Sequence, residues 1–290
     1  ISNYIDWVEI MDNRQQIHLE NLSLRYRGIE TSALKHISVD AEFGHVIGII
    51  GNHHAGKTSL CRALAGIVPT IISGDVTGTI QVGSLSPNLD WQKYNQQTGV
   101  VLQNPAGQLS GLADTVADEI AFDLINQGVP ADQIKRRVLN VADQLGLGDQ
   151  LNQSPGTLSG GQKQRLAIAT AIVTDPSILV LDDPTSEMDP LGRQHFFSWL
   201  VSVEKKTIFI VSNEVDDLCE IADQIWVLKA GELVAAGKPL TVFNHLKPDW
   251  QLAEPTVFRL AKLMKWSIPG AADEFPVTNQ QLEEAYYAAN

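Results

Sequence analysis

Residues 51–58 read GNHHAGKT and fit the pattern G-x-x-x-x-G-K-[ST]. Such a loop turns successive backbone N–H groups toward one point, where they hold the oxygens of a phosphate group. Lys57 would pair with the β- and γ-phosphates of a nucleotide, and the Thr58 hydroxyl would ligate Mg²⁺. A short apolar run precedes the loop and a helical pattern follows it, which is the context that this pattern requires. The sequence therefore predicts a nucleotide site here.

Two histidines, His53 and His54, stand inside this predicted phosphate loop, where they are unusual. One interpretation is that both face solvent and are tolerated by the backbone geometry. The other is that one of them touches the phosphates or reshapes the loop. The residues of this stretch that are predicted to contact nucleotide are Gly51, Asn52, His53, His54, Ala55, Gly56, Lys57, Thr58 and Ser59.

A second stretch, ILVLDDPTSEMDP at 178–190, places two carboxylates at the end of a run that should be a buried strand. Four aliphatic residues lead directly into Asp182 and Asp183, and a proline turn follows. A buried carboxylate costs free energy unless a cation or hydrogen bonds compensate for its charge. The pair therefore raises the question of what compensates that charge and whether both carboxylates take part in chemistry.

The elements that must position these residues alternate between strands and helices. Short, fully apolar runs are typical of strands buried on both faces of a mainly parallel sheet, whereas alternating patterns predict half-buried strands. Apolar strands are predicted at 46–50, 178–182 and 207–212, alternating strands from Ile17 and from His36, and a hairpin at 225–237. Helices are predicted at 58–67, 162–173 and 193–203, with a mostly helical block at 115–147. This alternation indicates an α/β fold with helices on both sides of a sheet.

The composition is that of a globular protein with ample material for a core. The chain has 290 residues, of which 44% are hydrophobic and 19% charged, and its net charge is -13. The acidic balance argues against broad binding to nucleic acid, which needs clustered Lys and Arg. Cys61 and Cys219 lack metal-ligand spacing and fit a reducing compartment better than a disulfide framework.

Membrane spans and targeting segments are not expected. No apolar run reaches the roughly 18–20 residues that a membrane helix needs, and no signal peptide opens the sequence, which begins at Ile1. We expect a chain that is soluble by itself and reaches a membrane only through a partner. Residues 1–16 are expected to form an amino-terminal extension. A composition shift near Pro239 predicts a small helical appendage at 241–290.

A third motif, LSGGQKQR at 158–165, lies between the other two. In this order the three motifs resemble the ATP-binding cassette (ABC) ATPases, and the resemblance covers residues 17–240. It implies a P-loop NTPase fold of the ABC type, with a helical subdomain at about 104–170 and a small, mainly helical C-terminal domain. In that family the signature residues press on the γ-phosphate held by a second subunit, so the resemblance implies a dimer. The matching residues here are Ser159, Gly160, Gly161 and Gln162.

The resemblance also assigns roles to single residues. Tyr26 matches the aromatic residue that stacks on adenine, although it could also be an ordinary half-buried strand tyrosine. Gln103 matches the glutamine that ligates Mg²⁺ and senses the membrane partner, and Asp182 matches the acid that holds Mg²⁺ through water. The predicted metal ligands are thus Thr58, Gln103 and Asp182. Asp189 lies in the loop that runs between the two subunits.

Two residues depart from the family pattern. Asp183 stands where the family usually has a glutamate that polarises the attacking water, and Asn213 where it usually has a histidine that grips the γ-phosphate. An amide donates a hydrogen bond but cannot carry positive charge or relay a proton. With Gln103, these two form the predicted catalytic set. We hypothesise that this chain's own site binds ATP and hydrolyses it slowly, whereas its unaltered LSGGQ completes a competent site on a homologous partner.

The stretch VVLQNPAGQLSGLADTVADEIAFDLINQGVP narrows the resemblance to the ATPases of energy-coupling-factor (ECF) transporters. The matching residues are Gln103, Asn104, Pro105, Gln108, Thr115, Val116, Glu119, Ile120, Ala121 and Phe122. The tail at 241–290 likewise resembles the C-terminal dimerisation appendage of that family. In the family, two ATPases bind a transmembrane coupling protein, and a separate membrane protein captures a vitamin or metal ion.

The resemblance therefore implies ATP and Mg²⁺ as cofactors, a homologous ATPase and two kinds of membrane protein as partners, and no nucleic acid. It places the chain at the cytoplasmic face of the cell membrane as a peripheral subunit. Four apolar side chains would line a groove for the coupling protein, or would simply be core residues of the helical block. These are Leu109, Leu112, Ile120 and Phe122.

Three alternatives stay open. A regulatory nucleotide-binding subunit with little turnover would explain the departures at Asp183 and Asn213. The ATPase of a conventional ABC importer is disfavoured by the tail and by the stretch at 103–122. A cassette ATPase that acts on DNA or ribosomes is disfavoured by the acidic balance and by the absence of long coiled insertions or a second cassette.

Overall fold

The computed structural model describes residues 16–104, 107–203, 205–271 and 273–289. The predicted amino-terminal extension therefore lies outside the described residues, apart from Gln16, as does Pro105. Within the described part, no helix has both the length and the apolar character that crossing a membrane requires. Both cysteines are buried and have free thiols.

A six-stranded sheet forms the centre of the described part, in the order β5-β6-β7-β3-β8-β9. All neighbouring strands are parallel except the β8–β9 hairpin, which is antiparallel. The strands are β3 (Val46–Gly51), β5 (Thr98–Val101), β6 (Ile178–Asp182), β7 (Thr207–Val211), β8 (Gln224–Lys229) and β9 (Glu232–Gly237). Every residue of β6 and β7 is buried, which confirms the interpretation of their apolar runs as strands covered on both faces.

Alternate residues of the central strands pack into two different cores. In β7, Ile208 and Ile210 belong to the core shared with the helical block, whereas Phe209 and Val211 belong to the core on the opposite face. The same division holds in β6, where Leu179 and Leu181 face the first core. Successive side chains of a strand point to opposite faces, so a strand between two cores must be apolar throughout.

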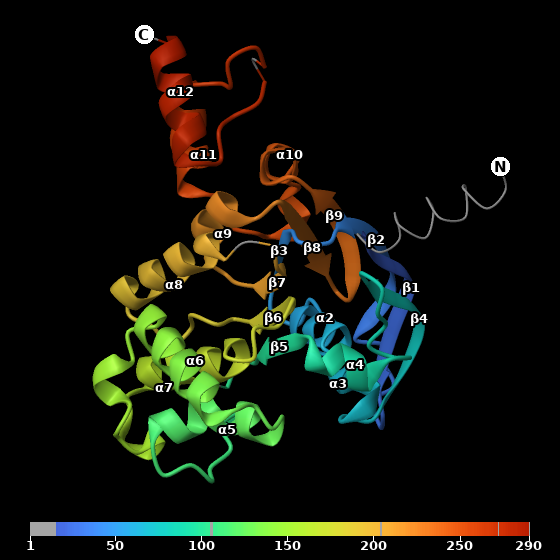
Figure 1. Cartoon of the computed structure of the whole chain (residues 1–290). Helices are drawn as coiled ribbons and strands as arrows, with labels where there is room; N and C mark the ends of the chain where they lie inside the picture. The colour runs from blue at the N-terminus through green and yellow to red at the C-terminus, as the bar shows by residue number, and fades with distance from the viewer. Residues whose placement is uncertain (1–15, 105–106, 204, 272, 290) are drawn as a thin grey trace, which may run out of the picture.

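A second, antiparallel sheet covers one face, which the prediction of helices on both sides did not include. Its order is β2-β1-β4, and its strands are β1 (Gln16–Tyr26), β2 (Leu34–Glu42) and β4 (Gly74–Val82). It lies beyond helix α2 (Lys57–Leu64) at one side of the molecule (Figure 1). Leu19, Ile37 and Ile80 of this sheet share a core with Leu60 of α2.

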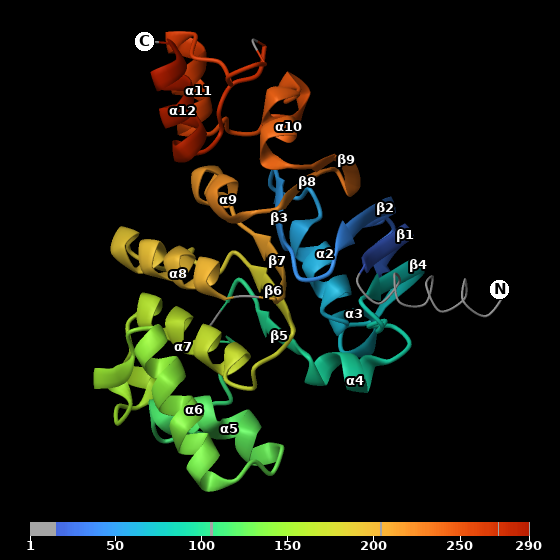
Figure 2. The ribbon, with the colours of Figure 1, turned by 45° about the horizontal axis from the view of Figure 1, so that its top comes forward.

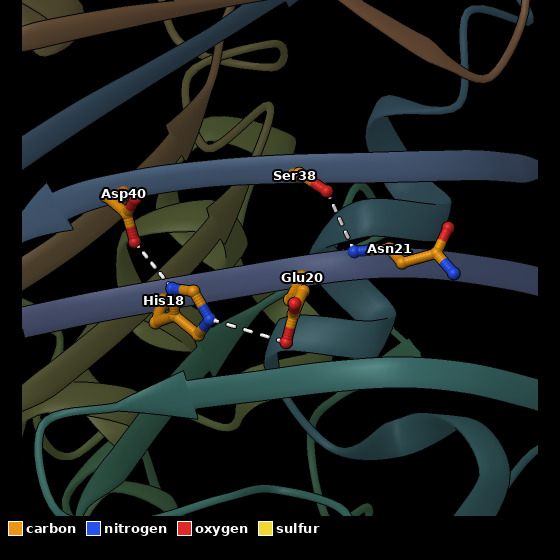
Figure 3. A network of polar contacts seen from close by, with 5 residues as sticks. All are labelled: His18, Glu20, Asn21, Ser38 and Asp40. Atoms are coloured by element: carbon orange, nitrogen blue, oxygen red, sulfur yellow. Dashed lines mark hydrogen bonds and ion pairs between the residues drawn. The ribbon is translucent and has the colours of Figure 1, made fainter.

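The outer face of the antiparallel sheet is polar, as the alternation in β1 requires. Figure 3 shows His18 of β1 beside Asp40 of β2, with 2.6 Å between Nδ1 and the carboxylate, and Glu20 on its other side. The backbone N–H of Asn21 donates to the Ser38 hydroxyl at 2.8 Å. These contacts tie β1 to β2 where the register shifts between Leu19 and Leu22.

The predicted helical block is present, and it lies on the side of the molecule away from the antiparallel sheet (Figure 2). It contains α5 (Val116–Asn126), α6 (Ala131–Gln144) and α7 (Gly160–Ile172). The Thr115 side chain caps α5, and Ser159 caps α7. Of the four residues predicted to line a groove or to belong to the core, Ile120 is fully buried and is therefore a core residue, whereas Leu112 is 77% exposed.

The helix predicted at 58–67 ends earlier, because Gly66 adopts a left-handed conformation with φ +69°. A Cβ there would also lie 2.8 Å from the Trp91 ring, so the site favours glycine. The short helices α3 (Ile67–Thr70) and α4 (Trp91–Gln96) follow.

The remaining α-helices of the described part follow β6 along the chain, and most of them contribute side chains to the same core as the helical block. They are α8 (Pro190–Ser202), α9 (Val215–Ile221), α10 (Pro239–Asn244), α11 (Thr256–Met264) and α12 (Asn279–Ala289). Figures 1 and 2 both show α11 and α12 side by side, next to α9. The C-terminal segment is thus helical, as predicted, and it adjoins the helix that follows β7.

Candidate functional site

A cavity of about 440 Å³ lies at the carboxyl ends of β3, β6 and β7. In open parallel sheets, this edge is where ligands bind. The cavity brings together six of the predicted loop residues (His53–Thr58) with Ser59, Gln103, Asp182, Asp183 and Asn213. Ala33, Arg62 and Val211 also line it, and sequence reasoning did not single them out. Residues far apart in the sequence therefore meet at one polar site.

The two framing glycines of the phosphate loop are required by close packing. A Cβ at Gly51 would overlap the backbone carbonyl oxygen of Leu228 in β8. At Gly56, where φ is +104°, a Cβ would lie 2.8 Å from the carbonyl oxygen of Ala33. Only glycine tolerates both demands, so the spacing in the sequence has a direct structural cause.

The Lys57 ammonium group is held by the loop itself. Its Nζ donates to the carbonyl oxygens of Gly51 at 2.5 Å and of Asn52 at 3.0 Å. Burial lowers the pKa of Lys57, and the nearby Asp182 and Asp183 carboxylates oppose that shift. The ammonium is thus placed inside the cavity, where a phosphate oxygen would be a stronger partner than a carbonyl.

Asp182 carries a buried carboxylate oxygen that lacks a hydrogen-bond partner among the described residues. The side chain is 2% exposed, and Oδ2 is the unpaired atom. Burial raises the pKa of Asp182, while the hydroxyl of Thr58 and the cations of Arg62 and Lys57 lower it. An orphaned carboxylate oxygen beside a hydroxyl, in one cavity with the Gln103 amide, is a donor set that Mg²⁺ prefers. These residues therefore fit the predicted metal.

Asp183 adopts a conformation that is uncommon for a residue with a side chain, with φ +54°. Its backbone N–H donates to the carbonyl of Val211 at 3.0 Å, which joins the end of β6 to the end of β7. Burial and the adjacent Asp182 charge both raise the pKa of Asp183. Asn213, two residues beyond β7, lines the same cavity.

Other predicted residues lie outside this cavity. The hydroxyl of Tyr26 donates to the Ser59 hydroxyl at 3.2 Å and accepts from Arg62 at 3.4 Å, so the half-buried ring is next to the rim. Ser159 and Gln162 cap α7 reciprocally, with bonds of 2.9 and 3.3 Å. The lining does not include Ser159, Gly160, Gly161 or Gln162. A single chain therefore does not bring its signature motif to its own phosphate loop.

Gln108 and Glu119 fix the loop after Gln103. Both match the family pattern in sequence, but neither was assigned a role there. The Gln108 amide accepts from the backbone of Leu102 at 2.7 Å and donates to the carbonyl of Val100 at 3.1 Å. The Gln108 amide thereby pairs with the backbone at the end of β5 as a neighbouring strand would. Glu119, 3% exposed, accepts from both the backbone N–H and the hydroxyl of Ser110, at 2.5 and 2.7 Å.

Replacing Glu119 by Ala is expected to lower the free energy of unfolding by about 1–3 kcal/mol, because the half-buried Ser110 donors lose their acceptor. Glu119→Gln keeps one acceptor oxygen and should cost less. Urea denaturation measures both, and Asp114→Ala, which removes an exposed carboxylate nearby, is the matched control. Equal losses for Glu119→Ala and Asp114→Ala would refute the anchoring role.

Comparisons with known proteins agree with this geometry. The family model described as "ABC transporter" matches residues 34–186. This chain belongs to the ABC transporter family. A putative ABC transporter ATP-binding protein of Pyrococcus horikoshii is 38% identical over 235 residues, which are 80% of this chain and 82% of that protein. The energy-coupling factor transporter ATP-binding protein EcfA1 of Mycoplasma mobile is 32% identical over 87% of this chain and 92% of its own length.

Solved structures confirm the ABC fold. The cbiO1 structure from Clostridium perfringens, described as part of the ABC transporter complex cbiONQ, aligns with a TM-score of 0.70 and 29% identity. The alignment covers 85% of this chain and 94% of that one. An ATP-binding cassette described as a dimer bound to ADP and Pi has a TM-score of 0.67 at 24% identity, and supports the fold alone. The cavity at the β3–α2 loop thus lies in an ABC ATP-binding domain similar to those of energy-coupling factor transporters.

Proposed function

We propose that this chain is an ATP-hydrolysing subunit of an ECF-type importer of a vitamin or another micronutrient. One observation carries the proposal: the cavity joins the phosphate loop and the Lys57 ammonium to the unpaired carboxylate oxygen of Asp182. The similarity to proteins named as ECF transporter ATPases over most of the chain supports the type of transporter.

The residues of the cavity have separable tasks in the proposed reaction. The loop N–H groups and Lys57 would hold the β- and γ-phosphates, and Thr58, Gln103 and Asp182, which line the same cavity, would hold Mg²⁺. When bound, Mg²⁺ would neutralise the charge that develops on the phosphate oxygens. Asp183 orients the attacking water and accepts its proton, and the Asn213 amide donates to the γ-phosphate. The products are ADP and inorganic phosphate.

The same residues explain why this site should be slow. The Asp183 carboxylate is one methylene shorter than a glutamate, and misplacement by about 1 Å costs roughly 10²-fold in rate. Asn213 supplies a hydrogen bond without positive charge. The raised pKa of Asp183 makes the carboxylate a stronger base, but it does not bring that carboxylate closer to the attacking water.

Pairing with a homologous ATPase would complete the site. The signature turn at the start of α7 lies outside the chain's own cavity, and Ser159 and Gly160 are exposed. The C-terminal helices also present apolar side chains to solvent, with Leu263 81% and Tyr287 70% exposed. Both surfaces fit contact with a second subunit. The partner's nucleotide would then meet this chain's unaltered LSGGQ.

Membrane attachment is proposed to occur through the helical block. Leu112 is 77% and Ile125 58% exposed, so apolar surface is available near the loop that follows Gln103. Leu109 and Phe122 are half-buried. A transmembrane coupling protein that docks here would hold the chain at the cytoplasmic face of the membrane, and a separate membrane protein would capture the substrate.

The asymmetric arrangement predicts unequal effects of two matched substitutions. After purification with its membrane complex and identification of each subunit by mass, the partner's catalytic carboxylate is replaced by its amide. Steady ATP turnover of the complex is expected to fall to background, whereas Asp183→Asn in this chain should change it little. Undiminished turnover after the partner's substitution would refute the asymmetry.

A regulatory subunit with little turnover is the second candidate, because Asp183 and Asn213, the two departures from the family pattern, both line the cavity. The isolated chain distinguishes the two. Mg²⁺-dependent phosphate release that disappears in Lys57→Ala would count against the regulatory function. Nucleotide binding without any release would favour it.

A further inference from the structure

One side chain of the phosphate loop does not line the cavity but reaches the C-terminal part of the chain. The Asn52 amide Nδ2 donates to the carbonyl oxygen of Trp250 at 3.1 Å and to the side-chain oxygen of Gln251 at 3.3 Å. The backbone carbonyl of the same residue accepts from Lys57 Nζ at 3.0 Å. Asn52 therefore links the Lys57 ammonium to a segment almost two hundred residues further along the chain.

The segment that receives Asn52 is itself fixed. Trp250 is 7% exposed and belongs to the core that contains the helical block. The neighbouring Asp249 carboxylate pairs with Lys229 of β8 at 2.8 Å. Gln251 follows in a left-handed conformation, with φ +52°. Both acceptors of the Asn52 amide thus belong to a segment, residues 249–251, that is held against the central sheet.

A second set of contacts joins the C-terminal helices to α9, the helix that follows Asn213. The Asp216 carboxylate of α9 accepts from the backbone N–H of Thr256 at 2.6 Å and from its hydroxyl at 2.9 Å, at the start of α11. Glu220, one turn later, accepts from the N–H and the side-chain amide of Asn279, both at 2.7 Å, at the start of α12. α9 begins two residues after Asn213.

We infer that Asn52 is a positioning residue through which the C-terminal part holds the phosphate loop in its nucleotide-binding shape. The loop binds phosphate with backbone N–H groups, so its affinity depends on how far its conformation is fixed before the ligand arrives. Tying Asn52 to Trp250 and Gln251 fixes the loop beside the carbonyls that hold Lys57. The inference rests on the proposed function only for the identity of the nucleotide.

The energetic coupling between the loop and the C-terminal segment is reciprocal. If the C-terminal segment stabilises the loop for ATP, then ATP stabilises the C-terminal segment by the same factor. Because α11 and α12 are tied to α9 as well, nucleotide at the cavity should also change how firmly these two helices are held.

Hydrogen exchange of the full chain tests the inference, with and without Mg²⁺ and the slowly hydrolysed analogue ATPγS. In the nucleotide-free chain, Asn52→Ala and Gln251→Ala should both raise exchange in the loop at 51–58. ATPγS should slow exchange at 248–264 in the unaltered chain but not in Asn52→Ala. Loss of two hydrogen bonds should weaken ATPγS affinity about three- to tenfold.

The controls separate positioning from general loosening. Gln251→Glu keeps an acceptor for Asn52 and should restore both readouts. Gln280→Ala, which removes an amide bonded to Glu284 within α12, should leave both unchanged. Unaltered loop exchange in Asn52→Ala, with normal ATPγS binding, would overturn the inference and leave the proposed function intact. If the unaltered chain binds no ATPγS but the variants still show faster loop exchange, the proposed function is refuted and the positioning role of Asn52 is not.

Discussion

Asp183→Glu combined with Asn213→His is expected to raise ATP turnover at this chain's own site by about two orders of magnitude. The added methylene moves the carboxylate outward by about 1.5 Å, and a displacement on the order of 1 Å changes rates roughly 10²-fold. The imidazole adds a group that can carry positive charge beside the γ-phosphate. Both positions line the cavity that contains Lys57, so both new side chains would act at the phosphate loop.

The measurement is steady phosphate release in a complex whose partner site has been disabled by replacing its catalytic carboxylate. The remaining turnover then belongs to the site on this chain. Adding Lys57→Ala to the double variant should return release to background, which shows that the gain arises at the phosphate loop. Each single substitution should give only part of the gain, because the two groups act on the same reacting centre. An unchanged rate in the double variant would show that something else limits the site.

Asp182→Asn should have opposite effects on stability and on activity. The nucleotide-free chain should become more stable at neutral pH by about 1–3 kcal/mol, because a buried charge with an unpaired oxygen is removed. Turnover should nevertheless fall by about 10²-fold or more, since the amide is a poor ligand for Mg²⁺ in place of a carboxylate. Thermal unfolding without nucleotide and ATPγS binding with and without Mg²⁺ measure the two effects separately.

The pH dependence of stability follows from the raised pKa of Asp182. The folded chain binds this proton more tightly than the unfolded chain, so stability decreases as the pH rises from the ordinary aspartate range through the raised value. Asp182→Asn removes this contribution, whereas Asp183 contributes with the same sign and remains. The slope should therefore become shallower without vanishing. Asp114→Asn, at an exposed position, is the matched control; the same slope in both variants would contradict the assignment.

Much of the central sheet could be predicted because burial on both faces leaves an unmistakable local pattern. The strands at 46–50, 178–182 and 207–212 are such cases. The antiparallel sheet was harder, since β4 has alternating, glycine-containing residues and pairs with β1 some sixty positions earlier. Short-range patterns do not reveal which distant strand supplies the partner. The early end of α2 depended on Gly66 meeting Trp91, which is also a long-range contact.

The site shows the same limit at the scale of single side chains. The spacing of the glycines and Lys57 identified the phosphate loop, because that geometry is local. The direction of the Asn52 amide could not be predicted, since its acceptors lie at Trp250 and Gln251. The sequence could not decide between groove and core for Ile120 for a related reason. Apolar residues of a helix give the same pattern whether they face a core or a partner.

The length of β7 is constrained by the two cores that it separates. Inserting or deleting one residue in the middle of the strand would send Phe209 toward the helical block and Ile210 toward the antiparallel sheet. Two hydrophobic interiors would be mismatched at once, and Asn213 would leave the cavity. Among related sequences, changes of chain length should therefore gather in the surface loops and avoid this strand, even where its individual residues vary.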